Sequence, residues 1–159
     1  AIAAAVEATM ADGEVRLGAA AGLWHDLVRE GEARAETRLP EPVEAYLVFL
    51  LMRHLRDGAL AGRTMALEWL QAMELAGRPR ADALRDVGDR CLLLAGWYPK
   101  LAERRRVSPD YFAAIGQSAY GEVAGSAGGG YGELFTELAG AYRAMVRVLA
   151  CSAATGPRA

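Results

Sequence analysis

The chain has 159 residues, which suits one domain that buries roughly two-thirds of the surface of its unfolded chain. A composition that is 53% hydrophobic and 24% charged excludes a disordered chain, and a net charge of −2 gives no global attraction for nucleic acid or acidic membranes. The two cysteines, Cys91 and Cys151, form neither a disulfide framework nor a metal-binding motif, so we expect a reducing, cytoplasmic setting.

The amino-terminal stretch "AIAAAVEATMADGEV" lacks the basic start and the long apolar run of a secretory signal or transit peptide. The most apolar stretch, residues 45–52, is only eight residues long, whereas a membrane span needs about 18 or more. We therefore expect a soluble protein without a visible targeting signal, although a chain that begins without Met is open to trimming.

Apolar residues recur along the chain with the 3.6-residue period of an α-helix, and no stretch alternates as a strand does. This pattern predicts one all-α domain, residues 1–151, built as a bundle of six to eight helices, and a disordered tail, residues 152–159. The first clear helix covers about residues 14–30. The next, residues 43–57, follows Pro40 and Pro42 and is apolar almost all round, so we expect it to be the central helix.

Glycine marks the ends of the following helices. Gly58 and Gly77 stand where a helix often ends in a left-handed residue, and the helix between them is expected to bury Met65, Trp69, Leu70 and Met73. A further helix begins near Pro79 with a stripe of Leu84, Val87, Cys91 and Leu94, and is interrupted by Gly96 and Pro99.

The stretch "ERRRVSPDYF", residues 103–112, predicts a boundary between two helices. A short basic helix, residues 100–106, ends in arginines that stabilise its last carbonyls, and Ser108 caps the next helix with Pro109 in its first turn. Two alternatives stay open: a basic patch that contacts an acidic partner, and a kinase site at Ser108. The patch comprises Lys100, Arg104, Arg105 and Arg106.

Two long helices are expected in the remaining sequence. One begins at Ser108 and presents Phe112, Ile115, Ala119 and Val123 to the core. The glycine-rich stretch from Gly125 to Gly132 predicts a flexible joint, and a single last helix follows over residues 133–151.

The two histidines are the first candidates for chemistry. His54 lies on the apolar face of the helix over residues 43–57, so it is either a satisfied core histidine or a ligand-binding residue in a pocket within the bundle. His25 lies at the edge of its apolar face, where a haem-ligating role is the alternative to a structural one. Nothing else in the sequence supports haem, and we expect no cofactor.

A row of acids follows Pro79. Asp82, Asp86 and Asp89 have the spacing i, i+4 and i+7, which places their carboxylates within about 60° on one helix face. Such a row can hold Mg²⁺ for a diphosphate substrate. Arginines surround it and the sequence contains no second acidic row, so the simpler interpretation is a solvated helix face and no metal site.

Part of the chain resembles a known group. The residues concerned are Gly88-Asp89, Leu92–Leu94, Gly96, Tyr98-Pro99, Val107-Ser108, Asp110-Tyr111, Gly116 and Ala119-Tyr120, together with "YLVFLLMRHLRDG" at residues 46–58. This pattern resembles uncharacterised helical proteins of proteobacteria. The resemblance implies a bacterial cytoplasmic protein, transfers no activity, and adds Asp89, Tyr111 and Tyr120 to the ligand-binding candidates; otherwise the tyrosines are amphipathic core residues with the hydroxyl at the rim.

No combination of residues identifies a catalytic site, and apolar helical surface is plentiful. The leading hypothesis is therefore a non-enzymatic interaction or regulatory protein that self-associates or binds a protein partner. The alternative is a small-molecule-binding protein or enzyme with a pocket at His54 or a magnesium–diphosphate site at Asp82, Asp86 and Asp89. Binding of nucleic acid through the basic patch is a third, less favoured hypothesis.

Overall fold

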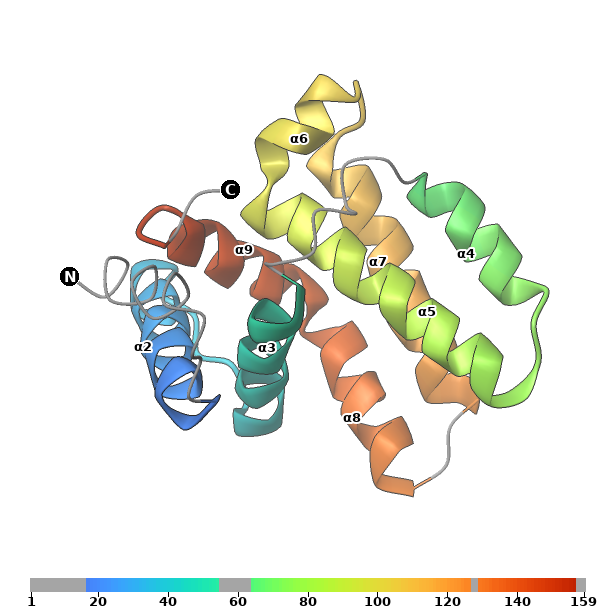
Figure 1. Ribbon diagram of the computed structural model, residues 1–159, viewed down its shortest axis with the longest axis horizontal. Helices are drawn as coiled ribbons and strands as arrows, with labels where there is room; N and C mark the ends of the chain where they lie inside the picture. The colour runs from blue at the N-terminus through green and yellow to red at the C-terminus, as the bar shows by residue number, and fades with distance from the viewer. Residues whose placement is uncertain (1–16, 55–63, 127–128, 157–159) are drawn as a thin grey trace.

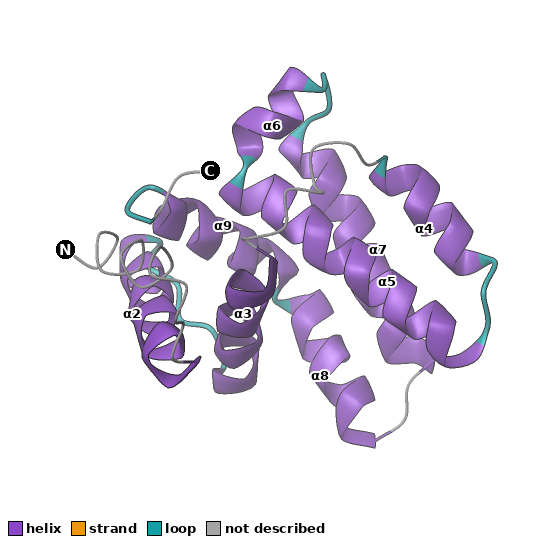
Figure 2. Ribbon diagram, viewed as in Figure 1, coloured by secondary structure: helices purple, strands orange, loops and turns teal. Residues whose placement is uncertain are grey.

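The computed structural model describes residues 17–54, 64–126 and 129–156, and over these residues it confirms an all-α bundle without strands (Figure 2). The described part contains eight α-helices and one π-helical segment, η2. Their bounds are α2 (Leu17–Arg34), α3 (Glu41–His54), α4 (Met65–Met73), α5 (Gly77–Leu92), η2 (Leu93–Trp97), α6 (Pro99–Arg104), α7 (Pro109–Ser126), α8 (Gly129–Gly140) and α9 (Tyr142–Ala153). The predicted helix end at Gly58 lies outside the described residues.

The helices pack around α5 and α7, which lie side by side in the middle of the molecule (Figure 1). Helix α4 flanks α5 on one side, and α8 packs against α7. On the other side α2 pairs with α3, and α9 runs from α8 back to α2 and η2. Segments far apart in the sequence therefore meet on α5.

The most enclosed stretch is the end of α5 with η2, because every residue from Val87 to Trp97 is buried. Helix α3 is buried over most of its circumference, as its apolar sequence predicts, but five of its residues are exposed: Glu41, Pro42, Ala45, Phe49 and Arg53. The N–H of Tyr98 donates to the carbonyl of Leu93 at 2.8 Å, which closes a π-type turn. The interruption predicted at Gly96 and Pro99 therefore falls only at Pro99, because the helix continues past Gly96 through η2 and α6 begins at Pro99.

The boundary between α6 and α7 matches the prediction. The Ser108 hydroxyl accepts a hydrogen bond from the N–H of Tyr111 at 3.1 Å, and Pro109 is the first residue of α7. Helix α6 ends in a Schellman turn, in which Arg106 adopts a left-handed φ of 57° and its N–H donates to the carbonyl of Glu103.

The single helix predicted over residues 133–151 is wrong, because the structure contains two helices that meet at Ala141. The side chain of Gln117 on α7 donates to the carbonyl of Ala139 at 2.9 Å. This bond satisfies a carbonyl at the break, where Ala141 has a ψ of 6°. The break allows α8 to pack on α7 while α9 turns toward α2.

Two predictions about irregular segments also need correction. The glycine-rich joint predicted over residues 125–132 is shorter, because α7 continues to Ser126 and α8 already begins at Gly129. The tail predicted to be disordered from residue 152 is ordered as far as Gly156. Ser152 is fully buried, and its hydroxyl lies against Gly31 of α2, where a Cβ atom would overlap it.

Candidate functional site

The carboxylate of Asp89 lies at the centre of the most concentrated polar contacts in the described core. Asp89 is 2% exposed, and its Oδ1 accepts the hydroxyl of Tyr46 at 2.6 Å and that of Tyr120 at 2.5 Å. These tyrosines come from α3 and α7, whereas Asp89 belongs to α5. One oxygen atom therefore joins three helices, and short bonds to a carboxylate are among the stronger hydrogen bonds in proteins.

Arg85 connects this cluster to the surface. It is one turn before Asp89 on α5, and its Nε lies 4.0 Å from Asp89 Oδ2 and donates to the Tyr46 oxygen at 3.1 Å. Its guanidinium also lies over the Tyr46 ring, 5.6 Å from the centroid. Burial by itself would lower the pKa of Arg85, but the Tyr46 and Asp89 oxygens outweigh burial and raise it. The guanidinium thus stabilises negative charge on a carboxylate that water does not reach.

The structure places His54 beside the same carboxylate. His54 is 4% exposed, and its Nε2 lies 3.4 Å from Asp89 Oδ2, the oxygen that the tyrosines do not use. This nitrogen makes no hydrogen bond to any described residue. His54, Asp89 and Tyr120, which the sequence singled out separately, therefore form one cluster.

Aromatic rings enclose the cluster. The Tyr120 ring makes edge-to-face contacts with Phe135 and Tyr142, each with 5.3 Å between centroids. The Tyr142 hydroxyl donates to the carbonyl of Gly88 at 2.8 Å, and the Tyr120 ring lies against Gly88 where a Cβ atom would overlap it. Burial raises the pKa of both Tyr120 and Tyr142 well above the ordinary value. These hydroxyls therefore stay protonated and act as hydrogen-bond donors.

The sequence missed Tyr46, Arg85 and Tyr142. The spacing of Arg85 and Asp89 is an ordinary i, i+4 ion-pair signal, but nothing along the chain connects it to tyrosines on other helices. The prediction that the Tyr120 hydroxyl lies at the rim of the core is wrong, because the residue is 0% exposed. The same expectation fails for Tyr111, which is 50% exposed on α7 and lies in no polar cluster of the described residues.

The acidic row on α5 is split by the fold. Asp82 is exposed with its Oδ2 3.9 Å from Arg78 Nε, and Asp86 pairs with Arg90 at 3.0 Å, whereas Asp89 points into the core. No group of three or more His, Cys, Asp or Glu side chains within the described ranges is arranged to hold a metal ion. The geometry therefore gives no support for a magnesium–diphosphate site.

Three residues of the basic patch, Arg104, Arg105 and Arg106, lie at the end of α6, whereas Lys100 lies in its first turn. Lys100, Arg104 and Arg106 are exposed and Arg105 is half-buried.

The cysteines are both free, and burial raises the pKa of the Cys91 thiol, which makes it a poor nucleophile.

His25 lies in a second cluster between α2 and α3. Its Nε2 lies 2.8 Å from Glu44 Oε1, and Arg29 Nε lies 3.8 Å from the same oxygen. Glu44 also faces Glu32, a carboxyl that is 5% exposed and accepts the N–H of Leu39 at 2.9 Å. Burial and the neighbouring Glu44 raise the pKa of Glu32. Burial also acts to raise the pKa of Glu44, but its hydrogen-bonding partners outweigh burial and lower it. The two neighbouring acids therefore ionise unequally, Glu44 more readily than Glu32.

The outer face of α4 is apolar. Met65 and Ala72 are buried, whereas Leu67 is 53% and Leu70 is 55% exposed, so the prediction that Leu70 is buried is wrong. The two leucines lie within about 60° of each other on the face opposite Met65. Leu75, which follows the helix, is 46% exposed. The described residues thus carry an uncovered leucine surface, formed by Leu67 and Leu70 on α4 and by Leu75 in the segment that follows it.

The helices of the described segments contain no stretch with the length and apolar composition of a membrane span.

The chain matches no protein-family model, and no curated protein or solved structure is significantly similar to it. Function must therefore be argued from the geometry alone.

Proposed function

We propose that this chain is a non-enzymatic interaction protein of the bacterial cytoplasm that self-associates, and that the leucine surface on α4 forms the contact. The observation that carries the proposal is the exposure of Leu67, Leu70 and Leu75, each about half exposed within nine residues. Exposed apolar residues that adjoin one another mark interaction surfaces, whereas single ones need no explanation. Covering them gains roughly 25 cal/mol for each Å² of apolar surface removed from water.

The enclosed chemistry around Asp89 supports the same proposal. Its Oδ1 is occupied by two tyrosine hydroxyls, and burial raises the pKa of Tyr46 and Tyr120 away from neutrality. An efficient general acid or base has a pKa near the working pH. The cluster therefore suits a role in holding helices together better than a role in proton transfer.

A second copy is the occupant that we favour for the α4 surface. A two-fold dimer uses the same patch on both subunits, so a leucine surface is complementary to itself without a separate binding groove. Glu74 and Arg78, which adjoin this surface, are both exposed and carry opposite charges. A copy that packs antiparallel would bring unlike charges together at the edge.

Light scattering and sedimentation over a concentration series test this proposal. The wild-type chain should associate, and Leu67→Glu with Leu70→Glu should give a monomer with an unchanged helical circular dichroism spectrum. Phe49→Glu is the matched control, because Phe49 is 51% exposed on α3, a helix that lies away from α4 (Figure 1). A wild-type monomer at high micromolar concentration, or association that survives the leucine changes, would contradict the proposal.

The alternative function, a small molecule bound inside the bundle, is favoured by one observation. His54 Nε2 is buried without a hydrogen-bond partner among the described residues, and buried polar atoms of this kind normally have one. Thermal shifts with Mg²⁺, haem and a panel of diphosphates test it. A shift that His54→Phe abolishes would favour the pocket, and no shift with any of them would remove its support.

A further inference from the structure

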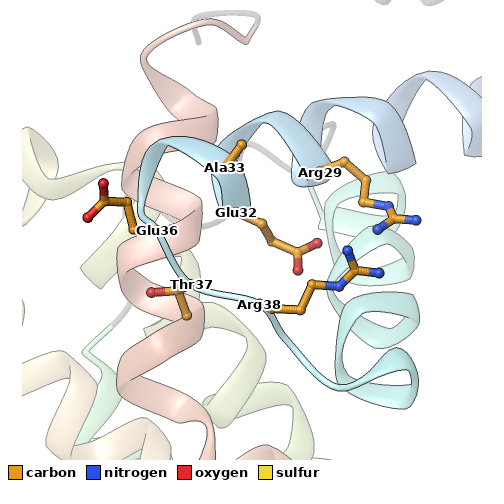
Figure 3. A pocket seen from close by; sticks show the side chains of 6 residues that line it. All are labelled: Arg29, Glu32, Ala33, Glu36, Thr37 and Arg38. Carbon is orange, nitrogen blue, oxygen red and sulfur yellow. The ribbon is translucent and has the colours of Figure 1, made fainter.

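A cavity of about 510 Å³ lies at the turn between α2 and α3 (Figure 3). Its volume is within the range of small-molecule pockets, roughly 300–1,000 Å³. The lining residues are Arg29, Glu32, Ala33, Glu36, Thr37 and Arg38. The self-association proposed above does not use this cavity, which lies on the other side of the molecule from α4 (Figure 1).

Backbone hydrogen bonds fix the wall of the cavity. Helix α2 ends in a Schellman turn, in which Glu36 adopts a left-handed φ of 50° and the N–H of Thr37 donates to the carbonyl of Glu32 at 3.0 Å. Beyond the turn, the N–H of Leu39 donates to the Glu32 carboxyl at 2.9 Å. Arg38 therefore projects from a segment that is tied down on both sides, and Arg29 projects from the regular helix.

Neither arginine of the cavity has a close ion pair with a described residue. Arg38 is exposed and acts on Glu32 through its electric field, while no hydrogen bond or ion pair joins it to another described residue. Arg29 has only the 3.8 Å contact with Glu44. Figure 3 shows both guanidiniums on one side of the cavity and the Glu36 carboxylate on the opposite side. The two positive charges therefore face a common space, and an anion placed between them would lower their mutual repulsion.

The floor of the cavity is Glu32, a buried acid whose pKa is raised by burial and by the neighbouring Glu44. Glu32 is 5% exposed, its Oε1 has no hydrogen-bond donor among the described residues, and Glu44 lies beside it. Burial and the like charge of Glu44 both disfavour the ionised form of Glu32. Glu32 therefore balances the charge of Arg38 less than an exposed carboxylate at the same place would.

We propose that the cavity between α2 and α3 binds a small anionic molecule, whose phosphate or carboxylate oxygens are held by Arg29 and Arg38. Planar guanidiniums bind both oxyanions through paired N–H···O bonds, and this geometry selects oxyanions over chloride. Ala33 and the Thr37 backbone form the wall against which the rest of the ligand packs.

Titration of the full chain with inorganic phosphate, and separately with succinate, tests the proposal. Amide NMR spectra follow binding at constant ionic strength, with chloride as the reference anion. At least one oxyanion should give saturable shifts in residues 29–38, and Arg38→Gln should weaken that binding by at least about tenfold. The arm that saturates identifies phosphate or carboxylate as the ligand group.

Arg34→Gln is the matched control, because Arg34 lies on the same helix but pairs with Glu30 at 3.1 Å and does not line the cavity. This variant should bind as the wild type does. Glu32→Gln, which keeps the floor neutral at every pH, should bind at least as tightly as the wild type. The proposal is overturned if neither anion gives saturable shifts, or if Arg34→Gln and Arg38→Gln weaken binding equally.

Discussion

Replacing Tyr120 by phenylalanine tests the role assigned to Asp89. The change removes one hydroxyl and leaves the ring, so it creates almost no cavity. The lost bond, 2.5 Å long, is made to a carboxylate in a fully buried environment. Hydrogen bonds to charged groups contribute about 1.5–3 kcal/mol, so Tyr120→Phe should lower the free energy of unfolding by about 2 kcal/mol. Tyr142→Phe, which loses a bond to the neutral Gly88 carbonyl, should cost about 1 kcal/mol.

The double change distinguishes a shared acceptor from two independent bonds. Tyr46 and Tyr120 donate to the same oxygen of Asp89, so each single variant leaves the other hydroxyl in place. Tyr46→Phe with Tyr120→Phe leaves Oδ1 without either donor in a site that water does not reach. The double variant should therefore lose more than the sum of the single losses, by about 0.5–3 kcal/mol.

Urea unfolding followed by circular dichroism measures these differences. Tyr131→Phe is the control, because the Tyr131 ring packs on Phe135 and is 40% exposed. Its loss should stay within about 0.5 kcal/mol. If Tyr120→Phe is as mild as this control, Asp89 does not hold the helices together through its tyrosine bonds.

Four further changes test separate parts of the fold. Gly88→Ala places a methyl group against the Tyr120 ring and should lower the free energy of unfolding, measured in urea, by about 1–3 kcal/mol. At an exposed helical glycine the same change would raise the free energy of unfolding. Ser108→Ala removes the cap of α7 and should cost about 1 kcal/mol; unchanged stability would show that the cap hydrogen bond contributes nothing. The pKa of Glu32 is raised in the folded state, so its contribution to stability is present at low pH and is lost as the pH rises through the folded pKa. Glu32→Gln removes the titrating group, so this variant should be more stable than the wild type at neutral pH. Glu44→Gln should be less stable than the wild type at neutral pH, because the pKa of Glu44 is lowered in the folded state. Equal pH profiles of the wild type and Glu32→Gln would contradict the interaction between the two acids.

The elements that the sequence predicted well are those fixed by local chemistry. Ser108 caps its own helix through the third residue of that helix, and Pro109 suits only the first turn, so the start of α7 needs no distant contact. The buried faces of α2 and α5 follow from the spacing of apolar residues, and Trp24, Leu84 and Val87 are buried as predicted.

The failures occur where a contact from another helix decides the backbone. A sequence without a proline over residues 133–151 favours one helix, and the break at Ala141 depends on the Gln117 side chain of α7. Leu70 has the same local preference as the buried residues of α4, but the position of α5 determines which face of that helix is covered.

The candidate site could be predicted only in pieces. His54, Asp89 and Tyr120 each stood out, but they lie on three different helices, and no period along the chain specifies that they meet. Tyr46 carried no signal at all, because a tyrosine in an apolar helix is an ordinary core residue until its hydroxyl has a partner.

The position of Asp89 bears on where activity is to be sought. A buried carboxylate is stable only when its charge is matched by donors, and here two tyrosines and Arg85 supply them from three helices. Any ligand that competed for Asp89 would have to displace donors whose raised pKa values keep their protons in place. Removing these bonds would lower the stability of the bundle, which argues against a substrate that displaces them. We therefore assign the proposed functions to surfaces whose side chains do not hold the helices together. These are the leucine surface at α4 and the arginines between α2 and α3.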